Sequence, residues 1–94
     1  MKSVTLNCKH MTSREELHDY LIKKLHLPDY YGKNLDALFD CLTDVGEPTV
    51  INIKNRELID ESMKQYTDIL FTVFANACED NENLTLKIID ETAE

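Results

Sequence analysis

The chain has 94 residues, a formal net charge of −8 at pH 7 and 43% hydrophobic residues. This length fits one domain, residues 1–94, and the composition is that of a folded globular protein rather than a disordered one. With 18 acidic residues against 10 Lys and Arg, the surface repels nucleic-acid phosphates and anionic membranes. We therefore expect no direct nucleic-acid binding and no membrane binding, and the charge suits a basic partner.

The strand and helix signals begin at the N-terminus. Residues 3–8 alternate apolar and polar, the period of a half-buried strand. Ser13, followed three residues later by Glu16, is a capping-box pattern that predicts the start of a helix. Pro28 ends this helix by the preceding residue, because a residue before proline avoids the α region.

A second helix is predicted for residues 35–43, with Asn34 as its N-cap. The apolar, β-branched run at 49–53 then predicts a buried strand. Asn55 is predicted to cap a short helix that reaches residue 63. A longer helix follows through 66–77, where apolar residues keep helical spacing.

The last element is a strand at 84–89, where apolar and polar residues alternate. The predicted order is therefore β-α-α-β-α-α-β. Strands separated by helical crossovers of this length indicate an α/β fold with a three-stranded parallel sheet, about four helices and right-handed connections.

The first residues lack the continuous apolar segment of a secretory signal, and no apolar run approaches the ~20 residues of a membrane span. Cys8, Cys41 and Cys78 are far apart and form no Cys-x-x-Cys pair, so a zinc or redox motif is not expected. Each lies in a stretch with strand or helix periodicity, which favours a buried thiol in a reducing compartment. Together these features predict a cytoplasmic protein.

The helix at 35–43 carries the most unusual pattern in the chain. On a wheel of about 100° per residue, its core stripe is Leu35, Leu38 and Leu42. The acidic residues of the opposite side are Asp36, Asp40 and Asp44. Thr43 lies beside the aspartates, Phe39 lies at the boundary, and Asp44 can lie past the helix end.

Two interpretations of this acidic side are open. A solvated helix face is the common one. However, like charges four residues apart repel by roughly a few tenths of a kcal/mol, and Asp44 opposes the helix dipole near the C-terminus. A helix that needed only solubility would interleave Lys, so a negative binding patch is the alternative.

Of Tyr30 and Tyr31, at least one is expected in the core, and the other, if exposed, adds an aromatic interface anchor.

A third hypothesis is a small hydrolase that uses Asp36 and Asp40, since paired carboxylates can act as acid and base. An exposed pair on one helix face has no cleft to raise one pKa, and its oxygens come from one side only, so they cannot surround a metal ion. The histidines form no ligand or triad cluster and are expected at the surface: His10, His18 and His26. With two glycines in the chain there is no phosphate-binding loop. We expect no catalysis, no cofactor and no metal.

The run LPDYYGKNLDALFDCLT, residues 27–43, resembles the signature of the barstar family, intracellular inhibitors of secreted microbial ribonucleases. Pro48 before the second predicted strand and Val73-Phe74 in the long helix are also similar to the family. The resemblance implies a three-stranded parallel sheet with four helices and, at Glu47–Pro48, a cis peptide bond. It implies a basic, extracellular-type ribonuclease as the protein partner, and we expect a monomer when the protein is free.

The resemblance also implies which residues bind the partner. In the family, the aspartates matching Asp36 and Asp40 meet the arginines and lysine that would hold RNA phosphate, and the tyrosine matching Tyr30 packs on the catalytic histidine. The acidic helix would therefore mimic the phosphates of the substrate. The partner-binding residues expected on this basis are Tyr30, Asn34, Leu35, Asp36, Phe39, Asp40, Thr43, Asp44 and Asn76.

The chain departs from the family pattern at positions in or near this surface. Phe39 replaces the usual tryptophan, Asp44-Val45 replaces a Gly-Trp pair, and Asn76 stands in place of an acidic residue. A barstar-like protein that binds a different basic protein is therefore the alternative to a ribonuclease inhibitor.

Overall fold

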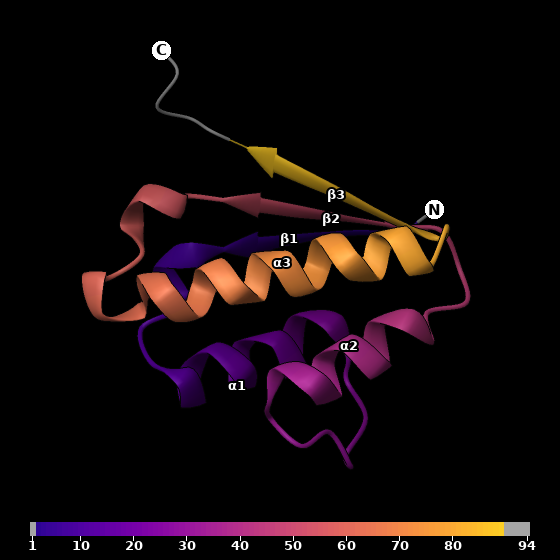
Figure 1. Cartoon of the computed structure of the whole chain (residues 1–94), viewed down its shortest axis with the longest axis horizontal. Coiled ribbons are helices and arrows are strands. Elements are labelled where there is room, and N and C mark those ends of the chain that lie inside the picture. The colour runs from indigo at the N-terminus through magenta and orange to yellow at the C-terminus, as the bar shows by residue number, and fades with distance from the viewer. Residues whose placement is uncertain (1, 90–94) are drawn as a thin grey trace.

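The computed structural model describes residues 2–89 as a two-layer α/β structure (Figure 1). Its three strands are β1 (Lys2–Asn7), β2 (Thr49–Lys54) and β3 (Leu84–Ile89), all parallel in the order β1-β2-β3. The α-helices of the described residues are α1 (Arg14–Leu25), α2 (Leu35–Thr43) and α3 (Lys64–Asp80). The three-stranded parallel sheet is thus confirmed, with α1 and α2 in the first crossover and α3 in the second.

The expectation of a fourth helix is wrong. Residues 55–63 form two single 3₁₀ turns, Arg56–Leu58 and Glu61–Met63, with extended backbone at Ile59 and Asp60 between them. Asn55 does not cap a helix, because its backbone is left-handed at φ 63° and its side chain makes no capping bond. Its Nδ2 instead donates to Oδ1 of Asn7, at 2.9 Å, which ties this turn to the end of β1.

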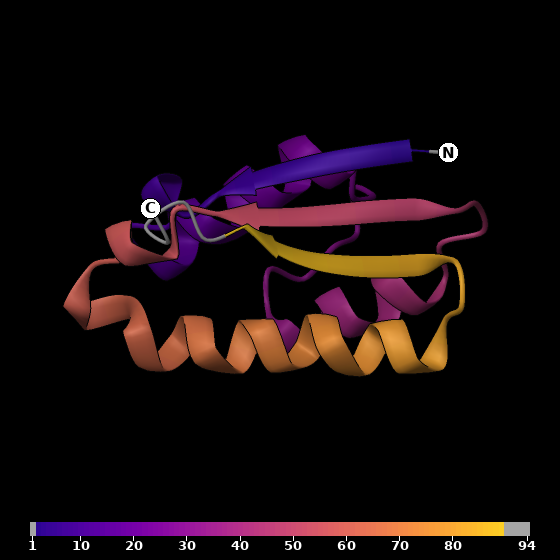
Figure 2. The same cartoon turned by 90° about the horizontal axis from the view of Figure 1, so that it is seen from above.

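All three helices lie on one side of the sheet, as Figures 1 and 2 show. Burial alternates along β2, where Thr49, Ile51 and Ile53 are buried and the residues between them are half-buried. The predicted buried strand is therefore buried on one face, and no helix of the described residues covers the second face. That face carries polar side chains, and Asn52 Nδ2 donates to Ser3 Oγ across it at 3.1 Å.

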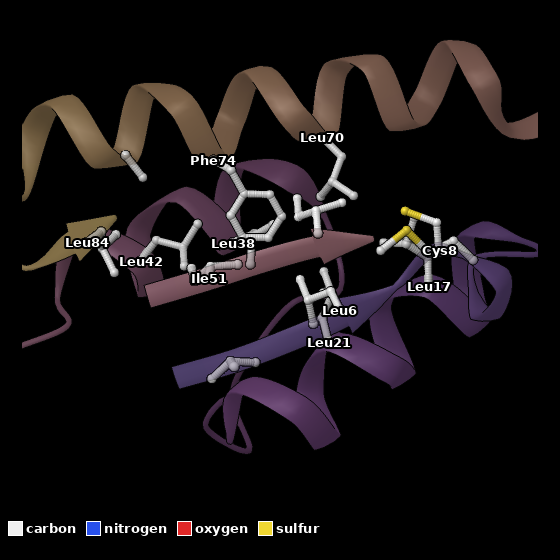
Figure 3. Close-up of a cluster of buried hydrophobic side chains, with 14 of the residues drawn as sticks. Leu6, Cys8, Leu17, Leu21, Leu38, Leu42, Ile51, Leu70, Phe74 and Leu84 are labelled. Carbon is white, nitrogen blue, oxygen red and sulfur yellow. The ribbon is translucent and has the colours of Figure 1, made fainter. Parts of the chain in front are cut away.

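The core lies between the sheet and the helices (Figure 3). Leu6 and Ile51 on the strands, Leu21 on α1, Leu38 on α2 and Phe74 on α3 are all fully buried. Each element contributes its apolar face, so the sheet and all three helices are held by one cluster of side chains. Among the residues that the structure describes, no helix has both the length and the apolarity that a membrane span needs.

The connections at Ser13 and Pro48 follow the sequence signals only in part. Ser13 Oγ accepts a hydrogen bond from Glu16 N at 3.1 Å, while the Glu16 carboxylate accepts from the Thr12 hydroxyl rather than from the Ser13 amide. The described residues contain no cis peptide bond, so the expected cis bond at Glu47–Pro48 is wrong. The Glu47–Pro48 bond is trans, and the Pro48 carbonyl accepts a hydrogen bond from Lys2 N at 2.9 Å where the strands begin.

The cysteines follow the prediction in part. Cys8 is buried, and burial raises the pKa of its thiol to about 11. Cys41 and Cys78 are half-buried, so they border the core rather than lying within it. All three are free thiols.

His18 is fully buried, so the expectation of a surface position is wrong for this residue, while His10 and His26 are exposed as predicted. Its Nδ1 lies 2.6 Å from the hydroxyl of Tyr31 and its Nε2 lies 2.7 Å from the hydroxyl of Tyr66. These hydroxyls supply the polar partners that a buried imidazole needs. The network joins α1, α3 and the loop before α2.

One proton arrangement satisfies the whole network. The Tyr31 hydroxyl donates its proton to the Asn34 carbonyl at 3.4 Å, so the Tyr31 oxygen accepts from His18 Nδ1–H. On the other side of the ring, His18 Nε2 accepts from the Tyr66 hydroxyl. This arrangement needs a neutral imidazole, since a protonated ring has no acceptor for Tyr66. Burial accordingly lowers the pKa of His18 below its ordinary value of 6.5.

We predict that acidification destabilises the fold through His18. The unfolded chain takes up a proton near pH 6.5 whereas the folded chain does not, so the free energy of unfolding falls as pH drops below that value toward the folded pKa. Urea midpoints at about pH 7.5 and about pH 5.5 measure the loss. His18→Gln, which stays neutral at both pH values, should lose less stability between them. An equal loss in both proteins would contradict the prediction.

Candidate protein-binding face

The acidic residues of α2 point away from the core. Leu38 and Leu42 are buried beneath the helix, whereas Asp36, Asp40 and Asp44 are exposed. The predicted core stripe is confirmed at Leu38 and Leu42. Leu35 is half-buried, because it starts the helix at the edge of the core. Phe39 is likewise half-buried, which leaves part of its ring beside the acidic side.

The start of α2 is set by Asn34, as predicted. Its Oδ1 accepts from Ala37 N at 2.8 Å, and its Nδ2 donates to the Gly32 carbonyl at 3.2 Å. Glycine at position 32 leaves room for this bond, because a Cβ there would lie 3.1 Å from Asn34 Nδ2 and would displace the capping side chain slightly. The Asn34 side chain is exposed, and both of its polar atoms are already bonded to backbone groups of nearby residues.

The two tyrosines before α2 divide as the sequence analysis expected. Tyr31 is 7% exposed and fixed by His18, whereas Tyr30 is 84% exposed. A ring this exposed has little packing to hold it in the free protein, so its apolar faces are available to a partner. Tyr31 thus fixes the loop that presents Tyr30.

The C-terminal end of α2 is held by a residue that the sequence analysis did not select. Asn81, the C-cap of α3, is 8% exposed. Its Nδ2 lies 3.0 Å from the Leu42 carbonyl, 2.9 Å from that of Val45 and 3.3 Å from that of Thr43. The last carbonyls of a helix have no partner within the helix, so this amide adds donors at the end of α2, where Val45 N also donates to the Leu42 carbonyl.

Thr43, which is half-buried, and Asp44, which is exposed, complete the C-terminal end of α2. The Thr43 hydroxyl donates to the Asp40 carbonyl at 3.0 Å, so its oxygen is left as an acceptor. Asp44 is the C-cap of α2, which confirms that its carboxylate lies past the last helical residue. Asn76 is exposed on α3, the neighbour of α2 (Figure 2), so the expected residue set comes from the loop before α2, from α2 with its two cap residues, and from α3.

The charge of this face is not neutralised within the described part of the chain. The one salt bridge there joins Lys33 Nζ to Asp19 at 3.0 Å, just before the N-terminal end of α2. Asp36, Asp40 and Asp44 thus have no cationic partner in residues 2–89. In the same residues, no group of three or more His, Cys, Asp and Glu side chains is arranged to hold a metal ion.

Comparisons with known proteins agree with this architecture. The family described as Barstar (barnase inhibitor) matches residues 1–91. A protein of Bacillus subtilis (strain 168), named "Putative ribonuclease inhibitor YrdF", is 39% identical over 92 residues, which are 97% of this chain and 100% of that protein. The chain therefore belongs to the barstar family, as its central motif predicted.

The role of Asn81 can be tested by Asn81→Ala. Removing the amide takes away the hydrogen bonds that join the end of α3 to the carbonyls of Leu42, Thr43 and Val45, so we expect a loss of about 1–3 kcal/mol in the free energy of unfolding. Urea denaturation measures this loss, and backbone NMR shifts should change at residues 42–46. Asn76→Ala, at an exposed position of the same helix, should change stability by less than about 0.5 kcal/mol. Equal stability of the two variants would show that Asn81 does not hold α2.

Proposed function

We propose that this protein is an inhibitor of a ribonuclease, which it blocks with α2 and the loop that carries Tyr30. The observation that supports this most is the exposed column of carboxylates on α2, unpaired within the described chain, beside a tyrosine that is 84% exposed. Membership of the barstar family and the name of the Bacillus subtilis relative support the same role.

The mechanism we propose is mimicry of the substrate. A ribonuclease holds RNA phosphate with Arg and Lys side chains, and these form charge-assisted hydrogen bonds with carboxylates as well. Asp36 and Asp40 lie one helical turn apart, about 6 Å along the axis, and so can meet neighbouring cations. Their mutual repulsion in the free protein is relieved when the partner supplies positive charge. The complementary fields also speed the encounter.

The remaining expected residues frame this contact. Tyr30 offers an aromatic ring to the active site, and Asn34, Leu35, Phe39 and Thr43 surround the aspartates. Asp44 extends the acidic column past the helix end, and Asn76 adds a polar contact from α3. The inhibitor is proposed to act without catalysis, since it occupies the active site rather than transforming RNA.

A second candidate is a different basic protein as partner. Phe39, Val45 and Asn76 replace residues that the family usually carries in or near this surface, and altered side chains at an interface change partner choice. Both candidates use the same acidic face and differ only in what it meets.

Co-expression tests the proposal. Secreted, basic microbial ribonucleases are expressed in a host cytoplasm with or without this chain, and growth and RNA integrity are recorded. We expect rescue from at least one ribonuclease, and inhibition of the purified enzyme at one inhibitor per enzyme. Binding without inhibition would favour the second candidate, and absence of binding to every basic ribonuclease would contradict the first.

Asp40→Ala should separate binding from folding. Asp40 is exposed and its repulsion with Asp36 and Asp44 is removed, so the free protein should be equally or slightly more stable in urea. Affinity for an inhibited ribonuclease should fall at least about tenfold at fixed salt, because the cations of the partner lose their counter-charge. Asp68→Ala, at an exposed position of α3, should leave both quantities unchanged.

Two results would contradict this prediction. A large loss of stability in Asp40→Ala would make Asp40 a structural residue. Unchanged stability with less than about a tenfold change in affinity would show that α2 is not the inhibitory element.

A further inference from the structure

A cavity of about 440 Å³ lies beside the second half of α2. It is bounded by the chain that leaves α1, by the end of α2 with its following loop, and by the starts of the strands. Its lining includes Tyr30, Asp40 and Asp44, which also belong to the proposed binding face. The volume falls within the range of about 300–1,000 Å³ that is typical of small-molecule sites.

The cavity is apolar inside and acidic at its rim. Leu42, Ile51 and Leu84 line it and are buried, and Figure 3 shows these three side chains together at one end of the core. The lining residues that are exposed, and therefore lie at the opening, include Asp40 and Glu47.

The charge of the rim favours a cation. Asp40, Asp44 and Glu47 contribute three carboxylates, against one lysine, Lys2, and His26. Among the described residues none of these carboxylates forms a salt bridge. A small inorganic cation would leave the apolar interior unused, and an uncharged apolar group would leave the carboxylates unpaired.

We propose that this cavity receives one arginine side chain of the partner ribonuclease. The inference rests on the proposed function and adds to it a second contact, separate from the phosphate mimicry of α2. The aliphatic part of arginine packs on the apolar interior while the guanidinium stays at the rim. There its planar fork pairs with the Asp44 and Glu47 carboxylates and can lie over the exposed ring of Tyr30.

Val45 makes the cavity accessible to such a group. It is half-buried, lines the cavity and presents only a short side chain there. A large aromatic ring at position 45 would occupy the space that the arginine needs. Its backbone is fixed by Asn81 Nδ2, which donates to the Val45 carbonyl at 2.9 Å, so the loop that forms this wall is held in place.

The first test uses n-butylguanidinium, a model of the arginine side chain, and n-butylurea, a neutral compound of the same shape. Each is titrated into the ¹⁵N-labelled protein. We expect saturable shifts at Val45 and Gly46 with a dissociation constant in the millimolar range. The guanidinium should bind at least about fivefold more tightly than the urea. Equal affinities, or shifts spread over acidic residues outside the cavity such as Asp68, would overturn the proposal.

Two variants locate the binding. Val45→Trp should fill the cavity and abolish the shifts caused by n-butylguanidinium. Asp44→Asn with Glu47→Gln neutralises exposed rim residues without touching the core, so it stays informative even if Val45→Trp does not fold. The double variant should weaken the guanidinium at least about fivefold and leave the urea unchanged. The control, Asp68→Asn, should bind both probes like the unmodified protein. Unchanged guanidinium binding in the folded variants would overturn the proposal.

A second arm uses a ribonuclease that the unmodified protein inhibits. Val45→Trp and the rim variant should each lower affinity at least about tenfold. If Asp40→Ala weakens the complex while these variants do not, the cavity proposal fails and the proposed function stands. If no ribonuclease is inhibited, the proposed function fails, and the probe titration still decides whether the cavity binds a guanidinium.

Discussion

The placement of α2 depends on buried hydrogen bonds at its two ends. At the start, His18 fixes the hydroxyl of Tyr31, three residues before the N-cap Asn34. At the end, the Asn81 amide lies within hydrogen-bonding distance of the last carbonyls of the helix. A helix of nine residues is too short to be stable alone, so these anchors and the burial of Leu38 and Leu42 hold it.

Because both ends of α2 are held by hydrogen bonds, its exposed side can carry a column of like charges that would destabilise an isolated helix. Asp36, Asp40 and Asp44 repel one another, each pair by roughly a few tenths of a kcal/mol, which is small against the burial of two leucines. The fold thus holds three carboxylates unpaired within the described chain. On the proposal made here, the partner supplies the missing positive charge, and preorganisation of α2 limits the entropy lost on binding.

The sequence predicted features that depend on neighbours along the chain and missed those that depend on distant residues. The strand 84–89, the Asn34 cap and the acidic side of α2 follow from local periodicity and capping chemistry. His18 was misplaced because its partner Tyr66 lies 48 residues away, and Asn81 was missed because the Leu42 carbonyl lies 39 residues away. The sequence predicted at least one of Tyr30 and Tyr31 in the core but did not choose between them, and Tyr31 is the buried one because its hydroxyl meets His18.

The central claim is that α2 and the Tyr30 loop are the surface covered by a ribonuclease. Hydrogen–deuterium exchange of the free and ribonuclease-bound protein tests it most directly, because protection maps the covered backbone without any substitution. The account predicts added protection in residues 29–47 and none on the open face of the sheet, reported by Thr85 and Lys87 on β3. Protection confined to that face, with residues 29–47 exchanging as in the free protein, would contradict it.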